Sequence, residues 1–437
     1  MNFKTWTVGI AVLTLSAAPA FAETEVGQWS FDQNVVPVGC CDDCCCGDDC
    51  CGDCCCGDDC CGDDCCGGCC DCGCGCGGTG LLSGVGPGYL EGFSLSDRLG
   101  FTAFTVGGWT QFGWTDDAVP LSPQGSNGTN GSFLDVPDRF NLHQQYFFAE
   151  RVADGSRGFD VGFRADLMYG TDGDTAQAFG NPPGSWDFQN GFDHGVYAWA
   201  LPQMYGEIAI NDLSVKIGHF YTIMGYEVVT APDNFFFSHA STLCNSEPFT
   251  HTGVLGTYTV VENLTLYGGW TLGWDTGFDN LNEGNNFLGG FSVGLSDAIT
   301  MTWTNAYGNF GAITQDGSED FAQSIVVDVN VTDRVNYVFQ TDYKKIDGSD
   351  DEDVGINQYL FYNFNDWLAF GNRIEWWRDG TGSPYANGDR VSNYNYTTGV
   401  NIRVFYNLVF RPEARTDWAP AGDFSVNNVA CDMILTY

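Results

Sequence analysis

Residues 159–169, with the sequence FDVGFRADLMY, alternate between two kinds of side chain almost without interruption. Successive side chains of a β-strand point to opposite faces of the sheet. One face of this segment therefore carries Phe159, Val161, Phe163, Ala165, Leu167 and Tyr169. The other face carries Asp160, Arg164 and Asp166. This pattern predicts a strand with one apolar surface and one charged surface.

Two more segments repeat the pattern. Residues 334–344 place Val335, Tyr337, Phe339 and Tyr343 opposite Arg334, Asn336, Gln340, Asp342 and Lys344. Residues 263–274 place Leu264, Leu266, Trp270, Leu272 and Trp274 opposite Asn263, Thr265, Tyr267 and Thr271. The alternating runs are about 10–12 residues long, whereas strands of soluble domains average about 5–6. A tilted strand that crosses a bilayer needs about 9–11 residues, so the length favours membrane-spanning strands.

The connections between these runs fall into two classes. Short turns occupy residues 261–263, 296–298, 332–334 and 363–366, and longer polar, Gly-rich stretches occupy residues 115–137, 171–194, 277–286 and 347–353. Short turns at one end and long loops at the other are typical of an outer-membrane barrel. Residues 433–437 form an apolar segment that ends on an aromatic side chain, as such barrels do. We therefore predict an all-β, transmembrane antiparallel outer-membrane β-barrel of about 12–16 strands over residues 98–437. A secreted sandwich or solenoid is the alternative.

The first residues predict export. Lys4 precedes an apolar stretch at residues 8–15, and Ala20-Phe21-Ala22 is a small-x-small cleavage site. This pattern indicates a cleaved signal peptide over residues 1–22, followed by a short linker at 23–39. The predicted location is the cell outer membrane, reached through an oxidising compartment in which disulfides persist.

Residues 40–78 form a low-complexity segment of Cys, Asp and Gly, followed by a Gly-rich linker at 79–97. Nineteen of the 21 cysteines lie here, and the segment cannot build an apolar core. We predict a disordered extension, and three hypotheses remain for its role: disulfide cross-links within and between chains, soft-metal binding by thiolates, and a tether without a specific partner. The candidate disulfide residues are Cys40, Cys41, Cys44, Cys45, Cys46, Cys50, Cys51, Cys54, Cys55, Cys56, Cys60, Cys61, Cys65, Cys66, Cys69, Cys70, Cys72, Cys74 and Cys76.

Composition excludes several classes of function. The net charge of −40 argues against binding of nucleic acid or anionic lipid. Residues 290–294 match the Gly-x-Ser-x-Gly pattern of hydrolases, but they lie inside a predicted strand, without the strand-turn-helix context that the chemistry requires. No other catalytic or cofactor motif is present, so the sequence predicts neither an enzyme nor a cofactor.

Three stretches in order carry a family resemblance. Residues 216–239 include KIGHF, GYE, PDN and FSH; residues 248–254 read PFTHTGV; and residues 407–417 read NLVFRPEARTD. From about residue 99 onward the chain resembles the OmpL-like β-barrel porin family, BBP2, which is common in planctomycetes. The resemblance implies an outer-membrane diffusion channel, and it does not extend to the cysteine-rich segment.

Candidate site residues follow from the predicted strand faces. Charges opposite the apolar face would line the lumen; the candidates are Arg164, Asp166, Lys216, Arg334, Asp342, Arg403, Arg411, Glu413, Arg415 and Asp417. The last four alternate in sign on one predicted face and would form an ion-pair ladder. Residues 225–252 form a long irregular stretch, either a loop that constricts the pore or an external loop. Its candidate residues are Glu227, His239, Glu247 and His251. The spacing of the two histidines fits no metal site.

The predicted function is passive diffusion of small hydrophilic solutes or ions, with cation preference because the chain is acidic. The cysteine extension would join the barrel to other Cys-rich envelope proteins. The alternative is a structural anchor for a disulfide-linked envelope layer, without channel activity. Expected partners are outer-membrane lipid, the solutes and, as in many porins, further copies of the chain, but not nucleic acid.

Overall fold

The computed structural model describes residues 94–437, apart from residues 102, 118–132, 190, 192, 315–318, 350–351, 379 and 381–389. The predictions for the signal peptide, the first linker and the cysteine segment lie outside the described residues. A short helix, α1 (Leu95–Leu99), crosses the predicted barrel boundary at residue 98 and precedes the first strand.

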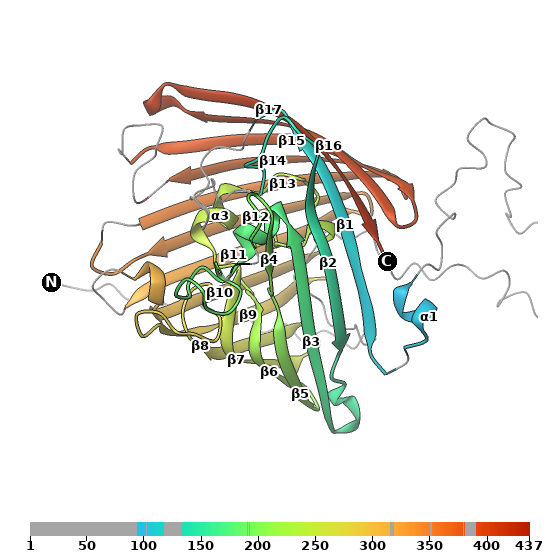
Figure 1. Cartoon of the computed structure of the whole chain (residues 1–437), viewed down its shortest axis with the longest axis vertical. Helices are drawn as coiled ribbons and strands as arrows, with labels where there is room; N and C mark the ends of the chain where they lie inside the picture. The colour runs from blue at the N-terminus through green and yellow to red at the C-terminus, as the bar shows by residue number, and fades with distance from the viewer. Residues whose placement is uncertain are drawn as a thin grey trace, which may run out of the picture.

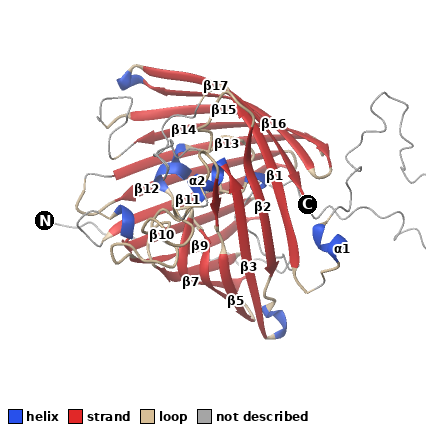
Figure 2. Ribbon diagram, in the orientation of Figure 1, coloured by secondary structure: helices blue, strands red, loops and turns tan. Residues whose placement is uncertain are grey.

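Long strands make up almost all regular structure (Figures 1 and 2). In chain order they are β1 (Thr105–Thr115), β2 (Asn141–Arg151), β3 (Phe159–Gly170), β4 (Ala198–Ala200), β5 (Met204–Ile210), β6 (Leu213–Tyr221), β7 (Thr250–Val261), β8 (Leu264–Thr271), β9 (Asn285–Ser296), β10 (Ile299–Asn309), β11 (Asp320–Thr332), β12 (Val335–Lys345), β13 (Glu352–Asn365), β14 (Leu368–Arg378), β15 (Ser392–Phe405), β16 (Leu408–Ala419) and β17 (Phe424–Thr436). Two further short helices are α2 (Thr171–Ala176) and α3 (Ser241–Ser246).

The strands close into one antiparallel barrel. Strand β1 pairs with β2 on one side and with β17 on the other, which joins the two ends of the sheet. Strands β4 and β5 both pair with β3, and residues 201–203 separate them, so they are two parts of one broken strand. The barrel therefore has sixteen strands, at the upper limit of the predicted range. Closure leaves no exposed sheet edge in the membrane.

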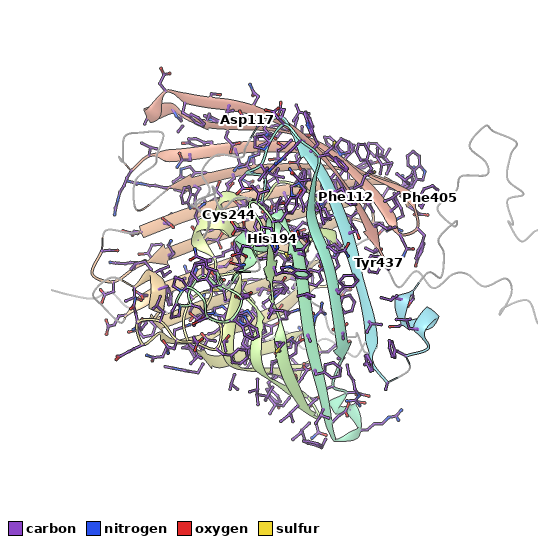
Figure 3. The ribbon with its side chains drawn as sticks, viewed as in Figure 1. Phe112, Asp117, His194, Cys244, Phe405 and Tyr437 are labelled. Carbon is purple, nitrogen blue, oxygen red and sulfur yellow. The ribbon has the colours of Figure 1, made fainter. Side chains whose placement is uncertain are left out.

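Connections alternate strictly between the two ends. Residues 211–212, 262–263, 297–298, 333–334, 366–367 and 406–407 are two-residue turns at one end, whereas the longer connections leave β1, β3, β6 and β8 at the other end, after Thr115, Gly170, Tyr221 and Thr271. Figure 3 shows the last residue, Tyr437, at the same end as Phe405, which precedes the β15–β16 turn. By the rule for bacterial barrels, the long connections face the cell exterior.

The faces of β3 have the predicted assignment. On β3, Phe159 is 69% exposed and Val161 is 49% exposed, whereas Asp166 is buried. Apolar side chains cover the outside because lipid surrounds the barrel, whereas the inside holds polar side chains together with apolar ones such as Leu288, Ala306 and Ala322. The two cysteines outside the cysteine segment form no disulfide with each other: Cys431 lies on the outer face of β17, and Cys244 lies in α3, inside the ring of strands (Figure 3).

Two boundaries differ from the sequence prediction. The third apolar face does not continue to Trp274, because β8 ends at Thr271 and the chain then turns inward, burying Trp274. Strand β12 begins at Val335, which leaves Arg334 in the preceding turn. Period-two patterns define the face of a strand but not its end. In the described part of the chain, no helix is long and apolar enough to cross a membrane.

Candidate functional site in the barrel lumen

Residues 222–249, which connect β6 to β7, fold into the barrel, and we refer to them as the lumen loop. Figure 1 shows α3, part of this loop, within the ring of strands. The loop contacts inward-facing side chains of β2, β12, β13, β14 and β16. All of these contacts join residues far apart in the chain. Side chains of the wall therefore position the loop.

Arg373, on β14, holds the middle of the loop. Its Nη1 donates to Glu227 Oε1 at 2.6 Å and to the Ser238 carbonyl at 2.8 Å, and its Nη2 donates to the His239 carbonyl at 3.2 Å. The Arg373 side chain is fully buried. A guanidinium carries five donors in a rigid fork, so a single arginine can hold an acid and two carbonyls at once.

Two arginines on β16 hold the loop in the same way. Arg411 donates from Nη1 to the carbonyls of Ala231 and Asn234, at 2.9 and 2.6 Å. Arg415 donates from Nη1 to the His239 carbonyl at 2.6 Å. Asp432 and Asp417 pair with the remaining guanidinium nitrogens of Arg411 and Arg415. Each positive charge is therefore neutralised on the wall while it binds loop backbone.

Carboxylates of the wall bind the amide hydrogens of the loop. Glu413 accepts from the amides of Phe237 and Ser238, at 2.8 and 3.0 Å. Glu375 accepts from the amides of Ser241 and Thr242, both at 2.9 Å, where α3 begins. Each carboxylate satisfies two consecutive buried N–H groups that no other strand or helix pairs. The arginines on β14 and β16 thus bind carbonyl groups of the loop backbone, and the glutamates bind its amide groups. We refer to these five side chains, Arg373, Glu375, Arg411, Glu413 and Arg415, as the clamp.

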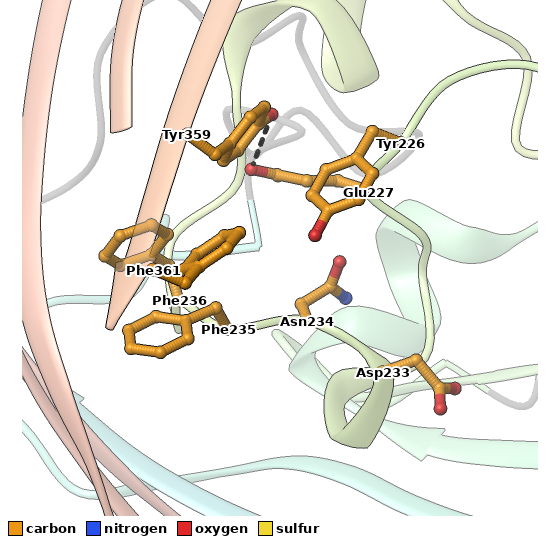
Figure 4. Close-up of a pocket in the computed structure, with 8 residues that line it drawn as sticks. All are labelled: Tyr226, Glu227, Asp233, Asn234, Phe235, Phe236, Tyr359 and Phe361. Carbon is orange, nitrogen blue, oxygen red and sulfur yellow. Dashed lines mark hydrogen bonds between the residues drawn. The ribbon is translucent and has the colours of Figure 1, made fainter. Parts of the chain in front are cut away.

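Glu227 is the acid at the centre of this clamp. It accepts from Arg373, from the Ala240 amide at 2.8 Å and from the Tyr359 hydroxyl at 3.1 Å, and lies 3.3 Å from His239 Nδ1. Burial alone would raise the pKa of Glu227, but Arg373 and these hydrogen bonds lower it to about 2. Figure 4 shows Glu227 and Tyr359 beside a cavity of about 10 Å³ that aromatic side chains line. A cavity of this size holds about one water molecule and no solute.

A second loop acid, Glu247, has no cation partner among the residues that the structure describes. The Gln340 amide on β12 donates both to Glu247 Oε1 at 2.5 Å and to Asp342 at 2.8 Å, so two buried carboxyl groups share one amide. Burial and the neighbouring Asp342 raise the pKa of Glu247 well above its usual range. Glu247 lies against Gly225, whose φ is +87° and whose position leaves no room for a Cβ. Glycine at position 225 leaves space for the carboxyl group of Glu247, which reaches Gln340 on the barrel wall.

The comparisons with known proteins agree with this architecture. Residues 103–432 match the family described as "Putative beta-barrel porin-2, OmpL-like". The chain belongs to this family. Among curated proteins none matches the chain significantly. This OmpL-like chain is a porin-like β-barrel channel of the outer membrane.

Solved structures share the fold at low sequence identity. The anion-selective porin from Comamonas acidovorans is 9% identical, with a TM-score of 0.52, and covers 76% of this chain and 99% of its own. The outer membrane channel DcaP of Acinetobacter baumannii is 11% identical, with a TM-score of 0.51, and covers 76% of this chain and 97% of its own. At these identities the likeness shows the fold alone.

The structure places most predicted lumen residues on the inner face. Arg411, Glu413, Arg415 and Asp417 share the inner face of β16, but all four are buried and contact the loop or each other rather than open space. Arg164 and Asp166 on β3 form an ion pair, and Lys216 on β6 lies over the ring of Tyr205. Asp342 and Arg403 belong to β12 and β15. Arg334 departs from the prediction, because it lies exposed in a turn.

The predicted constriction residues divide between loop and wall. Glu227, His239 and Glu247 belong to the lumen loop, whereas His251 lies on β7, with Nε2 at 3.1 Å from Thr222 Oγ1. The two histidines do not converge. Among the residues that the structure describes, no group of three or more His, Cys, Asp or Glu side chains could hold a metal ion.

Two residues that hold the loop, Arg373 and Glu375, were not identified from the sequence. They occupy alternate positions of a period-two segment, LAFGNRIEWWR, as Arg411 and Glu413 do on β16. Two opposite charges two residues apart in a period-two segment could therefore have identified Arg373 and Glu375. The polar face of β12 predicts that Asp342 lies beside Gln340, but it does not predict the contact with Glu247, which lies 93 residues away in the chain.

The two loop acids predict how docking depends on pH. Because the pKa of Glu247 is raised in the docked loop, the contribution of Glu247 to docking is greatest below about pH 4.3 and decreases as the pH rises. Glu227, with its lowered pKa, acts in the opposite sense, and its contribution is lost as the pH falls from about 4.3 towards 2. Docking is therefore expected to weaken as the pH rises from about 4.3 through the raised pKa of Glu247.

Hydrogen exchange of the loop amides measures this effect. Glu247→Gln should reduce the pH dependence, since it removes the acid but keeps a side chain of the same shape. It should not abolish the dependence, because burial raises the pKa of Asp275 to about 7, and Asp275 accepts the amides of Phe249 and Thr250. Glu262→Gln, in an exposed turn, is the matched control. A pH profile identical in Glu247→Gln and wild type would contradict the assignment.

Proposed function

We propose that the barrel conducts small hydrophilic solutes passively, with a preference for cations, and that the lumen loop narrows the passage. The observation that supports cation preference is the charge of the described side chains around the docked loop. The described side chains around the loop include four cations, Lys344, Arg373, Arg411 and Arg415. They also include seven carboxylates, Glu227, Asp342, Asp353, Glu375, Glu413, Asp417 and Asp432; Glu247 is left out of this count because burial raises its pKa well above the usual range. Low-dielectric walls lined by one sign of charge concentrate ions of the opposite sign.

Single-channel recording in a planar bilayer tests this proposal. We expect discrete conductance steps and, in a potassium chloride gradient, a reversal potential of the sign that cation selectivity requires. A reversal potential of the opposite sign would reject cation preference while leaving the channel in place.

A structural anchor without conduction is the second candidate function. Its support is the burial of inward-facing side chains at the height of the loop, including Tyr146, Leu288, Ala306, Ala322 and Arg373, on five different strands. A folded, heat-modifiable barrel that gives no current steps in the recording would favour the anchor over the channel.

The cysteine extension supports a further part of the proposal. We propose that residues 40–76 form disulfides with other Cys-rich envelope proteins and so tie the barrel to the envelope. The high cysteine content and the expected oxidising compartment support this role. Extraction of the native protein should therefore require a reductant as well as detergent. Equal extraction with and without reductant would exclude cross-linking.

A further inference from the structure

Two carboxyl groups and two neutral side chains meet where the lumen loop ends on the barrel wall. Glu247 comes from the loop, and Gln340 and Asp342 come from the inner face of β12, where Gln340 Nε2 donates to both acids. Ser324, on the inner face of β11, stands directly opposite Asp342 in the pairing of the two strands. Residues paired in this way have Cβ atoms about 4.5–5.5 Å apart. The four side chains therefore share one place, which we refer to as the junction site.

Each side chain of the junction site has an oxygen atom without a hydrogen-bond partner among the described residues. These atoms are Glu247 Oε2, Ser324 Oγ, Gln340 Oε1 and Asp342 Oδ1. None of the four residues is more than 4% exposed, so solvent does not reach them freely. Buried polar atoms in native proteins nearly always have a partner. Four unsatisfied oxygens at one place therefore point to an occupant that accepts their lone pairs.

The negative charge of the junction site is also uncompensated. Lys344 follows Asp342 on the inner face of β12, but its Nζ lies 2.8 Å from Asp353 Oδ2 and donates to the Asn245 carbonyl at 2.8 Å. Two buried carboxylates side by side disfavour each other's ionised form. One shared proton relieves this repulsion in part. A divalent cation relieves it completely, because it balances both charges.

We propose that the junction site binds one divalent cation of the calcium type. Every unsatisfied atom is an oxygen, which hard cations prefer, and the site offers no nitrogen or sulfur ligand to a softer metal. Calcium accepts carboxylate and amide oxygens together, in a flexible geometry of about 6–8 ligands. The two acids balance its charge, the amide and hydroxyl oxygens add neutral ligands, and water fills the remaining positions.

A cation at the junction site would fasten a part of the lumen loop that the clamp does not hold. The clamp acts from β14 and β16 and binds the loop between residues 227 and 242. The junction site instead ties Glu247, near the end of the loop, to β11 and β12. It concerns docking of the loop and is independent of what passes through the lumen. A chelator separates the effect of the cation from that of protonation of Glu247.

Hydrogen exchange of the full-length protein in detergent tests the proposal. Exchange of residues 243–249 is compared at about pH 8 in about 10 mM calcium chloride and in sodium chloride of equal ionic strength. With a Kd of about 10⁻⁴–10⁻³ M, as in extracellular calcium modules, calcium should slow this exchange about ten- to a hundredfold. Because the effect is read at these amides, calcium bound elsewhere on the acidic chain does not register. Equal exchange in the two salts would overturn the proposal and leave a shared proton as the occupant.

Matched variants distinguish the junction site from a general effect of calcium. Asp342→Asn removes one charged ligand and keeps its shape, and Asp328→Asn makes the same change on the inner face of β11, where Asp328 accepts from Asn336. We expect Asp342→Asn to abolish the calcium effect and Asp328→Asn to retain it. Equal calcium effects in Asp342→Asn and wild type, with both barrels folded by heat-modifiability, would refute the site.

A neutral ligand provides a milder second test, which also serves if Asp342→Asn does not fold. Ser324→Ala removes only the hydroxyl oxygen beside Asp342. The calcium concentration that gives half the protection of residues 243–249 should rise several-fold. The same half-protection concentration in Ser324→Ala and wild type would contradict the proposed ligand set.

Discussion

Replacing Arg373 by leucine should release the lumen loop and raise the single-channel conductance. The substitution removes the cation partner of Glu227, the Arg373 donor to the Ser238 carbonyl and one of the two donors to the His239 carbonyl, which keeps its hydrogen bond from Arg415. Removing one member of a buried ion pair costs about 3–5 kcal/mol, because the other charge stays buried without compensation. Such a loss weakens the docking of the middle of the loop, so we expect a wider and noisier channel.

The barrel itself should survive this change. Its strands remain paired by their own backbone hydrogen bonds, so migration on a gel should still shift on heating. Arg378→Leu is the matched control, since Arg378 lies exposed at the end of the same strand. Wild-type conductance in Arg373→Leu, with a folded barrel, would show that the loop is held elsewhere. Arg373→Lys, which keeps the charge but loses the planar fork, should give an intermediate conductance.

The sequence predicted those parts of the structure that depend on local pattern. Phe159, Val161 and Phe163 alternate with polar residues, and the pattern alone assigns them to the lipid face. Two-residue turns such as 297–298 are recognisable by their composition between apolar runs. Closure, with β1 against β17, then follows from the need to pair every edge in a bilayer. Arg334 shows where this reasoning ends, since periodicity does not say at which residue a strand begins.

Docking of the lumen loop had no comparable signal. The bond from Arg411 to Ala231 joins residues 180 positions apart, and that from Glu413 to Phe237 joins residues 176 apart. In both, the loop partner is a backbone group, which every residue type provides. The charged side chain on the strand can therefore be recognised in the sequence, whereas its backbone partner in the loop cannot. Charged side chains expected to face water in the lumen instead bind protein backbone.

Replacing Glu413 by alanine should speed up hydrogen exchange in the lumen loop. Glu413→Ala removes the acceptor of two buried amides, those of Phe237 and Ser238. An unsatisfied buried donor costs about 1–3 kcal/mol, so the pair loses about 2–6 kcal/mol. Arg411 and Arg415 flank Glu413 on the same face of β16, and neither gains a new partner when Glu413 is replaced by alanine. Hydrogen exchange at Phe237 and Ser238 should accelerate by at least tenfold, since about 1.4 kcal/mol corresponds to that factor.

The amides of Ser241 and Thr242 provide an internal control, because Glu375 holds them from a different strand. If the clamp acts at separate points, these two amides keep their protection in Glu413→Ala while Phe237 and Ser238 lose it. If the loop leaves the wall as one unit, all four amides exchange faster and the conductance rises as in Arg373→Leu. Either pattern requires Glu413 to stabilise the docked loop. Unchanged exchange at Phe237 and Ser238 would mean that their hydrogen bonds to Glu413 contribute nothing to docking.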